Sequence, residues 1–332
     1  MDFISVKENI DIPKYKQIVH SVEKALLDHT LRKGDRLPSI NSIRNKNSIS
    51  RDTVLLAFNE LKIRGIVQSV AGKGYYIKNE NIKIKQRVFL LFDELNAFKE
   101  DLYKSFLKNL TKNIEVDIYF HHFNPDVFSK LIYDSIGNYS QYIIMPANLK
   151  NTEIVIDKLP EDKVIILDQL PTELSKYASI YQNFEKDIYT ALQKEVKLLK
   201  KYDKFIFVFS KYKQPQGLLT GFQKFCKEYN IDCDTIPSME NREISNREVY
   251  LIPDDRNLIR IIMKIKENNF ELIENIGVIS YNETLLKEIV QDGITTISTD
   301  FKYMGKRLAQ MLFEKEKSKI ENPSKLILRN SI

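Results

Sequence analysis

The chain opens with segments of helical periodicity. Between Tyr15 and Asp28, apolar side chains recur three or four positions apart, which predicts an amphipathic helix with one buried stripe. A serine that can act as an N-cap marks the start of each of two further helices, predicted over Ser39–Asn47 and, after Ser50, over Arg51–Arg64. The third helix buries one apolar face and leaves its first turn exposed.

A strand-like pattern follows the third helix. Short apolar runs end at Val70 and resume at Tyr75, and residues 71–74 between them include two glycines. Apolar runs on both sides of a glycine-containing tip predict a β-hairpin. Three helices followed by such a hairpin, called the wing, make a winged helix-turn-helix, in which the second helix of the turn motif enters the major groove of DNA.

From Arg87 onward, short apolar runs alternate with stretches that have room for helices. The predicted strands are residues 88–92, 116–120, 142–145, 164–167, 204–209, 231–236, 249–252 and 276–279. Alternation of strand and helix predicts parallel sheets with right-handed crossovers, and this part of the chain is long enough for two such lobes. The predicted fold class is α/β overall, with a mainly α head and a two-lobed parallel-sheet domain. A ligand would lie between the lobes, at the carboxyl ends of the strands.

The charges are unevenly distributed along the 332 residues. Residues 1–80 contain 14 Lys and Arg against 9 Asp and Glu, and residues 81–87 add three bases and no acid. The remaining 245 residues contain 34 bases and 36 acids. A small basic head on a nearly neutral body is typical of a protein that binds a polyanion at one end.

Composition excludes several other classes of protein. The longest apolar runs, such as Phe205–Phe209, are five residues long, far below the roughly 20 that a membrane span requires. With no apolar signal core near the N-terminus, we expect a cytoplasmic protein without a membrane partner. Cys226 and Cys233 are expected to be reduced core residues, and the four histidines lack metal-ligand spacing. We therefore expect neither a metal site nor a cofactor.

The start of the third helix has the side chains that docking on DNA needs. Helix N-terminal amides attract phosphate, and Arg51 can reach a phosphate or the O6 and N7 acceptors of guanine. The hydroxyls of Ser50 and Thr53 can donate to backbone oxygens of the DNA. These residues predict a double-stranded DNA partner.

Five linked motifs between residues 13 and 77 resemble the DNA-binding head of GntR-type bacterial regulators. They are Tyr15-x-Gln17-Ile18, Gly34-Asp35-x-Leu37-Pro38-Ser39, Ser50-Arg51-x-Thr53-Val54, Leu61-x-x-x-Gly65-Ile66 and Gly72-x-Gly74. The resemblance implies DNA contacts from Arg51, Thr53 and the wing tip. Asn41 and Leu55 stand where the family often has arginine, so the operator can differ from the common one. The predicted DNA-binding residues are Arg36, Ser39, Asn41, Ser50, Arg51, Asp52, Thr53, Leu55, Gly72, Lys73 and Gly74.

The larger part of the chain resembles the effector domain of LacI/GalR-type regulators, a two-lobed fold akin to the periplasmic binding proteins. The motifs are residues 143–146, 164–168, 221–222, 276–281 and 294–297, with Met304-Gly305 after them. The resemblance implies a small effector, and a sugar, in particular a monosaccharide, is the expectation. The predicted domains are a winged head over residues 1–78, a linker over 79–87 and an effector-binding and dimerisation domain over 88–332.

Candidate effector-binding residues follow the ends of the predicted strands. Carboxylates, amides and aromatic rings at these places suit a hydroxyl-rich ligand. The family's arginine three residues before the Gly-Phe pair is replaced by Leu218, while Asp168 and Asp187 are expected to be structural caps. The predicted effector-binding residues are Asp93, Phe98, Gln169, Tyr181, Tyr212, Lys213, Gln216, Asp254, Asp255 and Asn282.

The favoured hypothesis is a ligand-responsive bacterial transcription regulator, a repressor of carbohydrate-utilisation genes. It would bind a roughly palindromic operator as a homodimer, because one recognition helix reads too few bases for genomic selectivity. Two alternatives remain open at this point. One is a sugar sensor whose head binds a protein, and the other is an enzyme, since some GntR-type heads are fused to a pyridoxal-phosphate aminotransferase domain. No phosphate-cradling loop or nucleophile elbow supports catalysis in the sequence.

Overall fold

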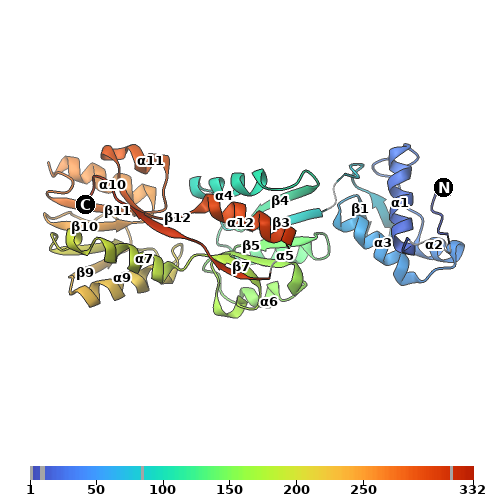
Figure 1. Cartoon of the computed structure of the whole chain (residues 1–332), viewed down its shortest axis with the longest axis horizontal. Helices are drawn as coiled ribbons and strands as arrows, with labels where there is room; N and C mark the ends of the chain where they lie inside the picture. Colours follow the sequence, from blue (N-terminus) through green and yellow to red (C-terminus); the bar gives the residue numbers. More distant parts are fainter. Residues whose placement is uncertain (1–2, 8–11, 84–85, 315–316) are drawn as a thin grey trace.

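The computed structural model describes residues 3–7, 12–83, 86–314 and 317–332, which form three bodies in a row (Figure 1). A small helical body with a two-stranded sheet carries the N-terminus, and two larger bodies each contain a six-stranded sheet. We call these bodies the head, lobe 1 and lobe 2. The remaining residues of the predicted head, linker and effector domain lie outside the described part of the chain.

The head follows local signals in the sequence. Its elements are α1 (Lys14–Leu27), α2 (Ile40–Asn47), α3 (Arg51–Ile63), β1 (Val67–Val70) and β2 (Gly74–Ile77). Ser39 and Ser50 cap α2 and α3, because their side chains accept hydrogen bonds at 3.1 Å from the backbone N–H groups of Ser42 and Thr53. The predicted helices and hairpin are therefore present, with ends shifted by one residue at most.

A short segment before α1 completes the core of the head. Ile4 is 4% exposed and packs among apolar side chains of the three helices. The N–H of Val6 donates to Asn47 Oδ1 at 3.0 Å, and the N–H of Lys7 donates to Gln17 Oε1 at 2.8 Å. No apolar periodicity marks this segment, so its packing is not predicted from the sequence.

Lobe 1 is a parallel sheet with the strand order β13-β7-β6-β5-β3-β4. Its strands are β3 (Gln86–Phe92), β4 (Ile114–Phe120), β5 (Gln141–Ile144), β6 (Val164–Asp168), β7 (Ala178–Tyr181) and β13 (Lys319–Glu321). Its helices are α4 (Ala97–Lys108), α5 (Pro125–Ser135), α6 (Thr152–Ile156) and α12 (Phe301–Glu314). Side chains alternate along β3, so that Leu90 packs with α4 and α12 while Leu91 packs with α5 and α6.

Lobe 2 has the strand order β14-β12-β11-β10-β8-β9. Its strands are β8 (Lys204–Val208), β9 (Cys233–Ile236), β10 (Glu248–Ile252), β11 (Ile276–Tyr281), β12 (Thr295–Thr299) and β14 (Ser324–Ile327). Its helices are α7 (Phe184–Lys194), α8 (Val196–Leu199), α9 (Gln216–Tyr229), α10 (Asp255–Glu267) and α11 (Leu285–Ile289). Short 3-10 turns lie at Glu161–Lys163 and Thr172–Leu174 in lobe 1 and at Val290–Asp292 in lobe 2.

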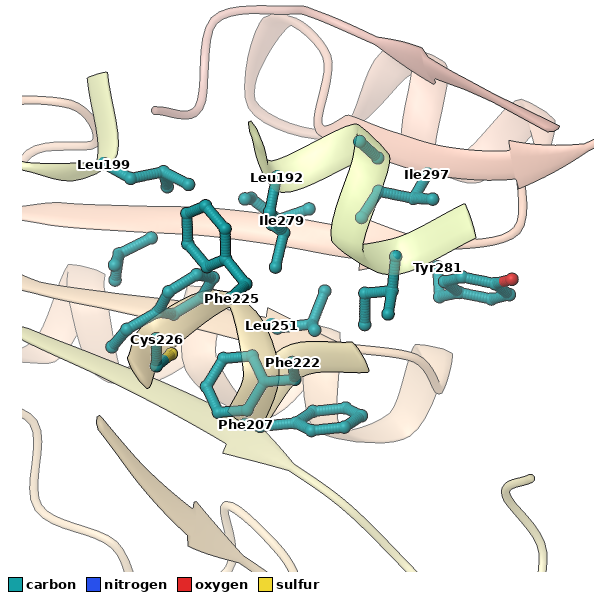
Figure 2. Packing of buried hydrophobic residues seen from close by; sticks show 14 of the residues in the cluster. Leu192, Leu199, Phe207, Phe222, Phe225, Cys226, Leu251, Ile279, Tyr281 and Ile297 are labelled. Atoms are coloured by element: carbon teal, nitrogen blue, oxygen red, sulfur yellow. The ribbon is translucent and has the colours of Figure 1, made fainter. Parts of the chain in front are cut away.

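The core of lobe 2 explains the Gly-Phe pair of the sequence. Phe222 of α9 packs against the sheet with Phe207 and Leu251 (Figure 2). A Cβ added at the neighbouring Gly221 would lie 2.4 Å from the carbonyl oxygen of Glu185 in α7. The glycine therefore lets α7 and α9 approach closely, which is a packing role and not a ligand contact.

Three connections join the lobes within the described residues. The chain passes from lobe 1 to lobe 2 after β7, returns after β12, and passes to lobe 2 again after β13. Asn322, on the third connection, donates through its N–H to the Tyr181 carbonyl at 2.7 Å and through Nδ2 to Thr299 Oγ1 at 3.0 Å. One asparagine thus ties all three connections together.

The sheets differ from the prediction mainly at their edges. The eight predicted strands are present, but β7, β12, β13 and β14 are additional. These four are short or rich in Ser, Thr and Lys, so they lack the apolar run by which the others are predicted. β14 pairs antiparallel with β12, which corrects the expectation of parallel strands at that edge.

Candidate DNA-binding and ligand-binding sites

The first turn of α3 lies on the surface of the head. Arg51 is exposed, and it makes no ion pair within the described part of the chain. The hydroxyls of Ser50 and Thr53 share a hydrogen bond at 2.8 Å, and Ser50 also caps the helix. The helix N-terminus and the unpaired guanidinium of Arg51 together provide a place where a phosphate or a guanine edge can bind.

The wing tip has a backbone conformation that glycine favours. The φ angles of Gly72 and Gly74 are 70° and 110°, in the left-handed region that residues with a Cβ rarely adopt. Lys73 between them is exposed. A Cβ added at Gly74 would lie 3.5 Å from the guanidinium of Arg36, so the tip and Arg36 are neighbours.

The other predicted DNA-binding residues occupy the same helix-turn-helix. Ser39 caps α2, Asn41 lies exposed in its first turn, Asp52 is exposed in the first turn of α3 and Leu55 is half-buried one turn later. All eleven residues therefore lie in the segment before α2, in α2, in the turn that ends at Ser50, in α3 or in the wing. Whether they contact DNA stays a prediction.

Polar side chains converge at the ends of the lobe 1 strands. Asp93 follows β3 and forms an ion pair with Lys99 of α4, and both residues are about 95% buried. Asp168 ends β6 and accepts a hydrogen bond from Gln182 Nε2 at 2.5 Å. Burial raises the pKa of Asp168 to about 6, and the charges of Lys99 and Asp93 also act on it. The Asp93–Lys99 pair and the Asp168–Gln182 pair are therefore close neighbours.

Two further residues extend this group toward lobe 2. Asp187 lies on α7, and burial, followed by the charge of Glu321, raises its pKa to about 7. Tyr281 ends β11, and Figure 2 shows its hydroxyl pointing away from the apolar side chains of lobe 2. Burial raises the pKa of Tyr281 well above its usual value, with Asp187 and Asp168 contributing through their charges. We call Asp93, Lys99, Asp168, Gln182, Asp187 and Tyr281 the junction cluster.

The lobes also touch each other directly. Asn148 Nδ2 in lobe 1 donates to the Gln214 carbonyl in lobe 2 at 2.7 Å. Lys213 Nζ lies 3.7 Å from a carboxylate oxygen of Glu94 and 5.9 Å from the ring centre of Phe123. The loop after β8 therefore contacts the ends of the lobe 1 strands.

The structure brings together only some of the predicted effector-binding residues. Asp93 belongs to the junction cluster, and Lys213 lies between the lobes. Asp254 caps α10, with both carboxylate oxygens accepting hydrogen bonds from Asn257 at 2.9 and 2.8 Å. Phe98 stacks on Phe301 with ring centres 4.8 Å apart. Asp254 and Phe98 therefore have structural partners that account for them.

The remaining predicted residues are scattered. Tyr212 is 75% exposed, and Gln216 is exposed at the start of α9. Asp255 lies 3.3 Å from the buried Lys287, whose pKa is lowered by burial. Gln169, Tyr181 and Asn282 are half-buried at strand ends, and Asn282 Oδ1 has no hydrogen-bond partner among the described residues. Leu218, at the place of the family's arginine, is 2% exposed in the core of lobe 2.

Several members of the junction cluster are absent from the predicted site. Asp168 and Asp187 are not the helix caps that we expect from the sequence: Asn183 caps α7, and Asp168 bonds to Gln182 at a strand end. Lys99 and Gln182 belong to no motif identified in the sequence, and Tyr281 ends the 276–281 motif but is not among the predicted ligand-binding residues. Only position in the sequence could have identified members of this cluster. Asp93 and Asp168 each follow an apolar run that predicts a strand, whereas Asp187 does not.

The described residues also lack metal-binding groups of side chains and membrane-spanning helices. No group of three or more His, Cys, Asp or Glu side chains in the described residues is arranged to hold a metal ion. No helix in the described part of the chain is long and apolar enough to cross a membrane.

Two segments match known families. Residues 14–77 match the gntR family of bacterial regulatory proteins, and residues 198–332 match the periplasmic binding protein-like domain. The first segment is the head, and the second contains most of lobe 2 together with α12 and β13 of lobe 1.

Three transcriptional regulators match stretches of 72 to 99 residues of this chain. The chain is 35% identical to the HTH-type transcriptional regulator YcxD of Bacillus subtilis over 72 residues. This stretch covers 22% of this chain and 16% of YcxD. The chain is 29% identical to the HTH-type transcriptional repressor YtrA of the same species over 99 residues. This stretch covers 30% of this chain and 72% of YtrA. The mannosyl-D-glycerate transport/metabolism system repressor MngR of Escherichia coli is 30% identical over 82 residues, covering 25% of this chain and 34% of MngR. The chain thus spans only a minor part of YcxD and MngR.

Solved structures with a similar fold cover the two lobes. The dimeric Lac repressor with an 11-residue C-terminal deletion superposes with a TM-score of 0.63 at 14% identity, over 74% of this chain and 98% of that one. A periplasmic binding protein/LacI transcriptional regulator from Alkaliphilus metalliredigens, complexed with D-xylulofuranose, superposes with a TM-score of 0.59 at 12% identity. The match covers 74% of this chain and 99% of that one. At these identities the likeness concerns the fold alone.

Proposed function

This chain joins a DNA-binding head of the gntR family to a two-lobed domain with the LacI and periplasmic-binding-protein fold, and from this premise we propose that it is a ligand-responsive transcriptional regulator. The head would be residues 1–78, the linker 79–87 and the effector domain 88–332. The single observation that carries the proposal is the exposed, unpaired Arg51 at the capped start of α3. It lies on the helix that docks in the major groove in winged helix-turn-helix proteins.

We further propose that the regulator binds a palindromic operator as a homodimer. Lobe 2 exposes large apolar side chains on two neighbouring helices: Ile259 and Met263 on α10, and Leu285 and Ile289 on α11 are each at least 50% exposed. The ion pair between Asp255 and Lys287 joins these helices. An apolar surface of this kind favours contact with a second copy.

The dimer surface can be tested by one charged substitution. Leu285 is 81% exposed, so Leu285→Asp should leave the fold intact and weaken dimerisation by burying an unpaired charge at the contact. We expect sedimentation to give a dimer for the wild type and a monomer for the variant at micromolar concentration. Lys227→Asp, which also places an aspartate on an exposed helix position but on α9, is the control. A wild-type monomer would contradict the surface and the dimer.

The effector is proposed to be a small sugar bound where the lobes meet. Support comes from the names of similar proteins: one structure with a similar fold is complexed with D-xylulofuranose, and MngR is the repressor of a mannosyl-D-glycerate transport/metabolism system. Repression of carbohydrate-utilisation genes is the corresponding role in the cell. Binding can affect DNA affinity only if the ligand prefers one of two protein states, and a coupling of about 1–3 kcal/mol changes operator affinity about 5- to 150-fold.

A contact between lobe 1 and the head gives a route for this coupling. Arg87 of β3 forms ion pairs with Glu115 and Asp117, and its side chain lies over Gly65, just after the end of α3. A Cβ added at Gly65 would lie 2.6 Å from Arg87 Cδ. A movement of β3 would therefore act on the end of the proposed recognition helix.

Operator binding tests the proposal. An operator is first selected from random duplex DNA with the whole protein, and affinity is then measured over a range of salt concentrations. We expect Arg51→Ala to weaken operator binding by about 1–3 kcal/mol, and Lys73→Ala to reduce the salt slope by about 1. Glu80→Ala, exposed and beyond the wing, is the control.

Two outcomes would contradict the proposal. If no sequence is enriched, or if Arg51→Ala and Lys73→Ala both bind like the wild type, the head does not dock as proposed and a protein-binding head becomes the better hypothesis. If no sugar in a broad set changes operator affinity, the effector part fails while DNA binding stands.

A further inference from the structure

The junction cluster contains buried polar atoms without partners. Gln182 is 6% exposed and Tyr281 is 3% exposed, yet Gln182 Oε1 and the Tyr281 hydroxyl have no hydrogen-bond partner among the described residues. Asp187 Oδ2 is likewise buried and unpaired. A buried polar group without a partner costs roughly 1–3 kcal/mol. Several of them in one place indicate that something else supplies the missing hydrogen bonds.

Most of these unpaired atoms are acceptors. Gln182 uses its Nε2 to donate to Asp168, which leaves its oxygen as the free group. His121, which is fully buried after β4, is a neighbour of the cluster because the charges of Asp93 and Lys99 act on it, and it contacts the Met145 carbonyl through Nε2 at 3.1 Å. A carbonyl can only accept, so Nε2 carries the proton, and the unpaired Nδ1 of the neutral ring is an acceptor. The Tyr281 hydroxyl differs from these two atoms, because it can also donate.

The charges of the cluster are also unbalanced. Asp93, Asp168 and Asp187 contribute three carboxyl groups, and Lys99 contributes the one base among the six residues of the cluster. Two other lysines close to it have partners of their own: Lys186 pairs with Glu321 at 2.6 Å, and Lys213 pairs with Glu94 at 3.7 Å. Burial raises the pKa of Asp168 to about 6 and that of Asp187 to about 7, so a cation bound beside these carboxyl groups would favour their charged form, whereas an anion would be repelled.

We infer that the effector site accepts a small donor-rich ligand that carries a protonated amine, with an amino sugar as the expected class, and that it rejects phosphorylated and acidic sugars. The inference rests on the proposed function, because it specifies the ligand of the same site. The ammonium group would donate to Asp187 Oδ2 and Gln182 Oε1, and hydroxyls of the ligand would complete the bonds of His121 and Tyr281. A phosphate would bring further acceptors and negative charge to groups that need donors.

The test compares matched sugars on the full chain. Calorimetry measures the binding of glucose, galactose and mannose, of their 2-amino derivatives, and of their 6-phosphates. We expect at least one amino sugar to bind about tenfold or more tightly than its parent sugar, and no phosphate to bind more tightly than its parent. The inference is overturned if a 6-phosphate is the tightest ligand, if the amino sugars bind no better than their parents, or if none of the nine compounds binds.

A variant separates the role of the charge from that of the fold. Asp187→Asn keeps the shape of the side chain and removes its charge, so it should reduce the preference for the amino sugar over its parent about tenfold or more. Asp234→Asn, on an exposed carboxylate of β9 paired with Lys204, should leave this preference unchanged. Thermal melting of both variants checks that they fold. An unchanged preference in a folded Asp187→Asn protein contradicts the assignment.

The inference and the proposed function fail in different ways. An amino sugar that binds but leaves operator affinity unchanged would contradict the proposed regulation and support the inference. A phosphorylated sugar that releases the operator would support the proposed function and overturn the inference.

Discussion

Lys99→Met should lower the free energy of unfolding of the protein by about 3–5 kcal/mol, the usual cost of removing one partner from a buried ion pair. Lys99 and Asp93 are 5% and 4% exposed, so the variant leaves a carboxylate buried without its cation. The remaining partner of that carboxylate in the structure is the N–H of Glu94, at 2.6 Å. A hydrogen bond from one amide does not replace the lost charge.

A matched control lies on the same helix. Lys104 pairs with Glu100 at 2.6 Å, but these side chains are 68% and 50% exposed. Exposed pairs contribute about 0–1 kcal/mol, so Lys104→Met should have little effect. Urea unfolding followed by tyrosine fluorescence suits a chain with 17 tyrosines and no tryptophan. Equal stability of the two variants would show that the Asp93–Lys99 pair is not buried as described.

Gly305→Ala should destabilise lobe 1 by about 1–3 kcal/mol, the range for overpacking a core. A Cβ at position 305 would lie 2.3 Å from the Leu102 carbonyl oxygen and 2.9 Å from the Phe106 nitrogen, both backbone atoms of α4. Backbone atoms cannot turn aside as a side chain can, so α12 and α4 would have to separate. Glycine to alanine within a helix otherwise gains up to about 1 kcal/mol, so the contact decides the sign of the change.

The exposed neighbour of this glycine gives the comparison. Lys306→Ala removes an exposed side chain from α12 and should change the midpoint of urea unfolding very little. If Gly305→Ala proves as stable as Lys306→Ala, or more stable than the wild type, then α4 and α12 do not approach as closely as described. The result would also remove the packing explanation for the Met304-Gly305 motif.

The head could be predicted almost entirely from sequence because its signals are local. Ser39 and Ser50 cap the helices that directly follow them, and the positive φ angles of Gly72 and Gly74 define the wing. The exception is Ile4, whose burial depends on a contact with helices later in the chain. A single apolar residue in a short segment gives no periodicity to detect.

In the lobes, local sequence signals do not predict every strand. β12 is fully buried, but its residues Thr295–Thr299 are mostly threonine and serine, so the strand has no apolar run. Their hydroxyls have partners far along the chain, such as the Arg329 carbonyl, to which Thr295 Oγ1 donates at 3.2 Å. A strand whose polar groups are satisfied by distant residues is not predicted from its own sequence.

The candidate ligand site was the least predictable part. Position after a strand identifies Asp93, but it equally selects Asp254, whose two carboxylate oxygens accept hydrogen bonds from the N–H and Nδ2 of Asn257 at the start of α10. Conversely, Asp187 lies within a helix and joins the junction cluster only because α7 packs beside the connections between the lobes. Distinguishing a cap from an unpaired acceptor requires the partners of each atom, and these are set by the tertiary structure.

The segment from β13 to β14 has a consequence for how the protein folds during synthesis. Residues 319–321 form an edge strand of lobe 1 and residues 324–327 form an edge strand of lobe 2. Neither sheet can therefore be completed until this late segment has left the ribosome, although the head can fold much earlier from its local contacts. A nascent chain would carry a finished DNA-binding unit ahead of two incomplete sheets, and the two lobes would gain their last strands almost together, as one cooperative step.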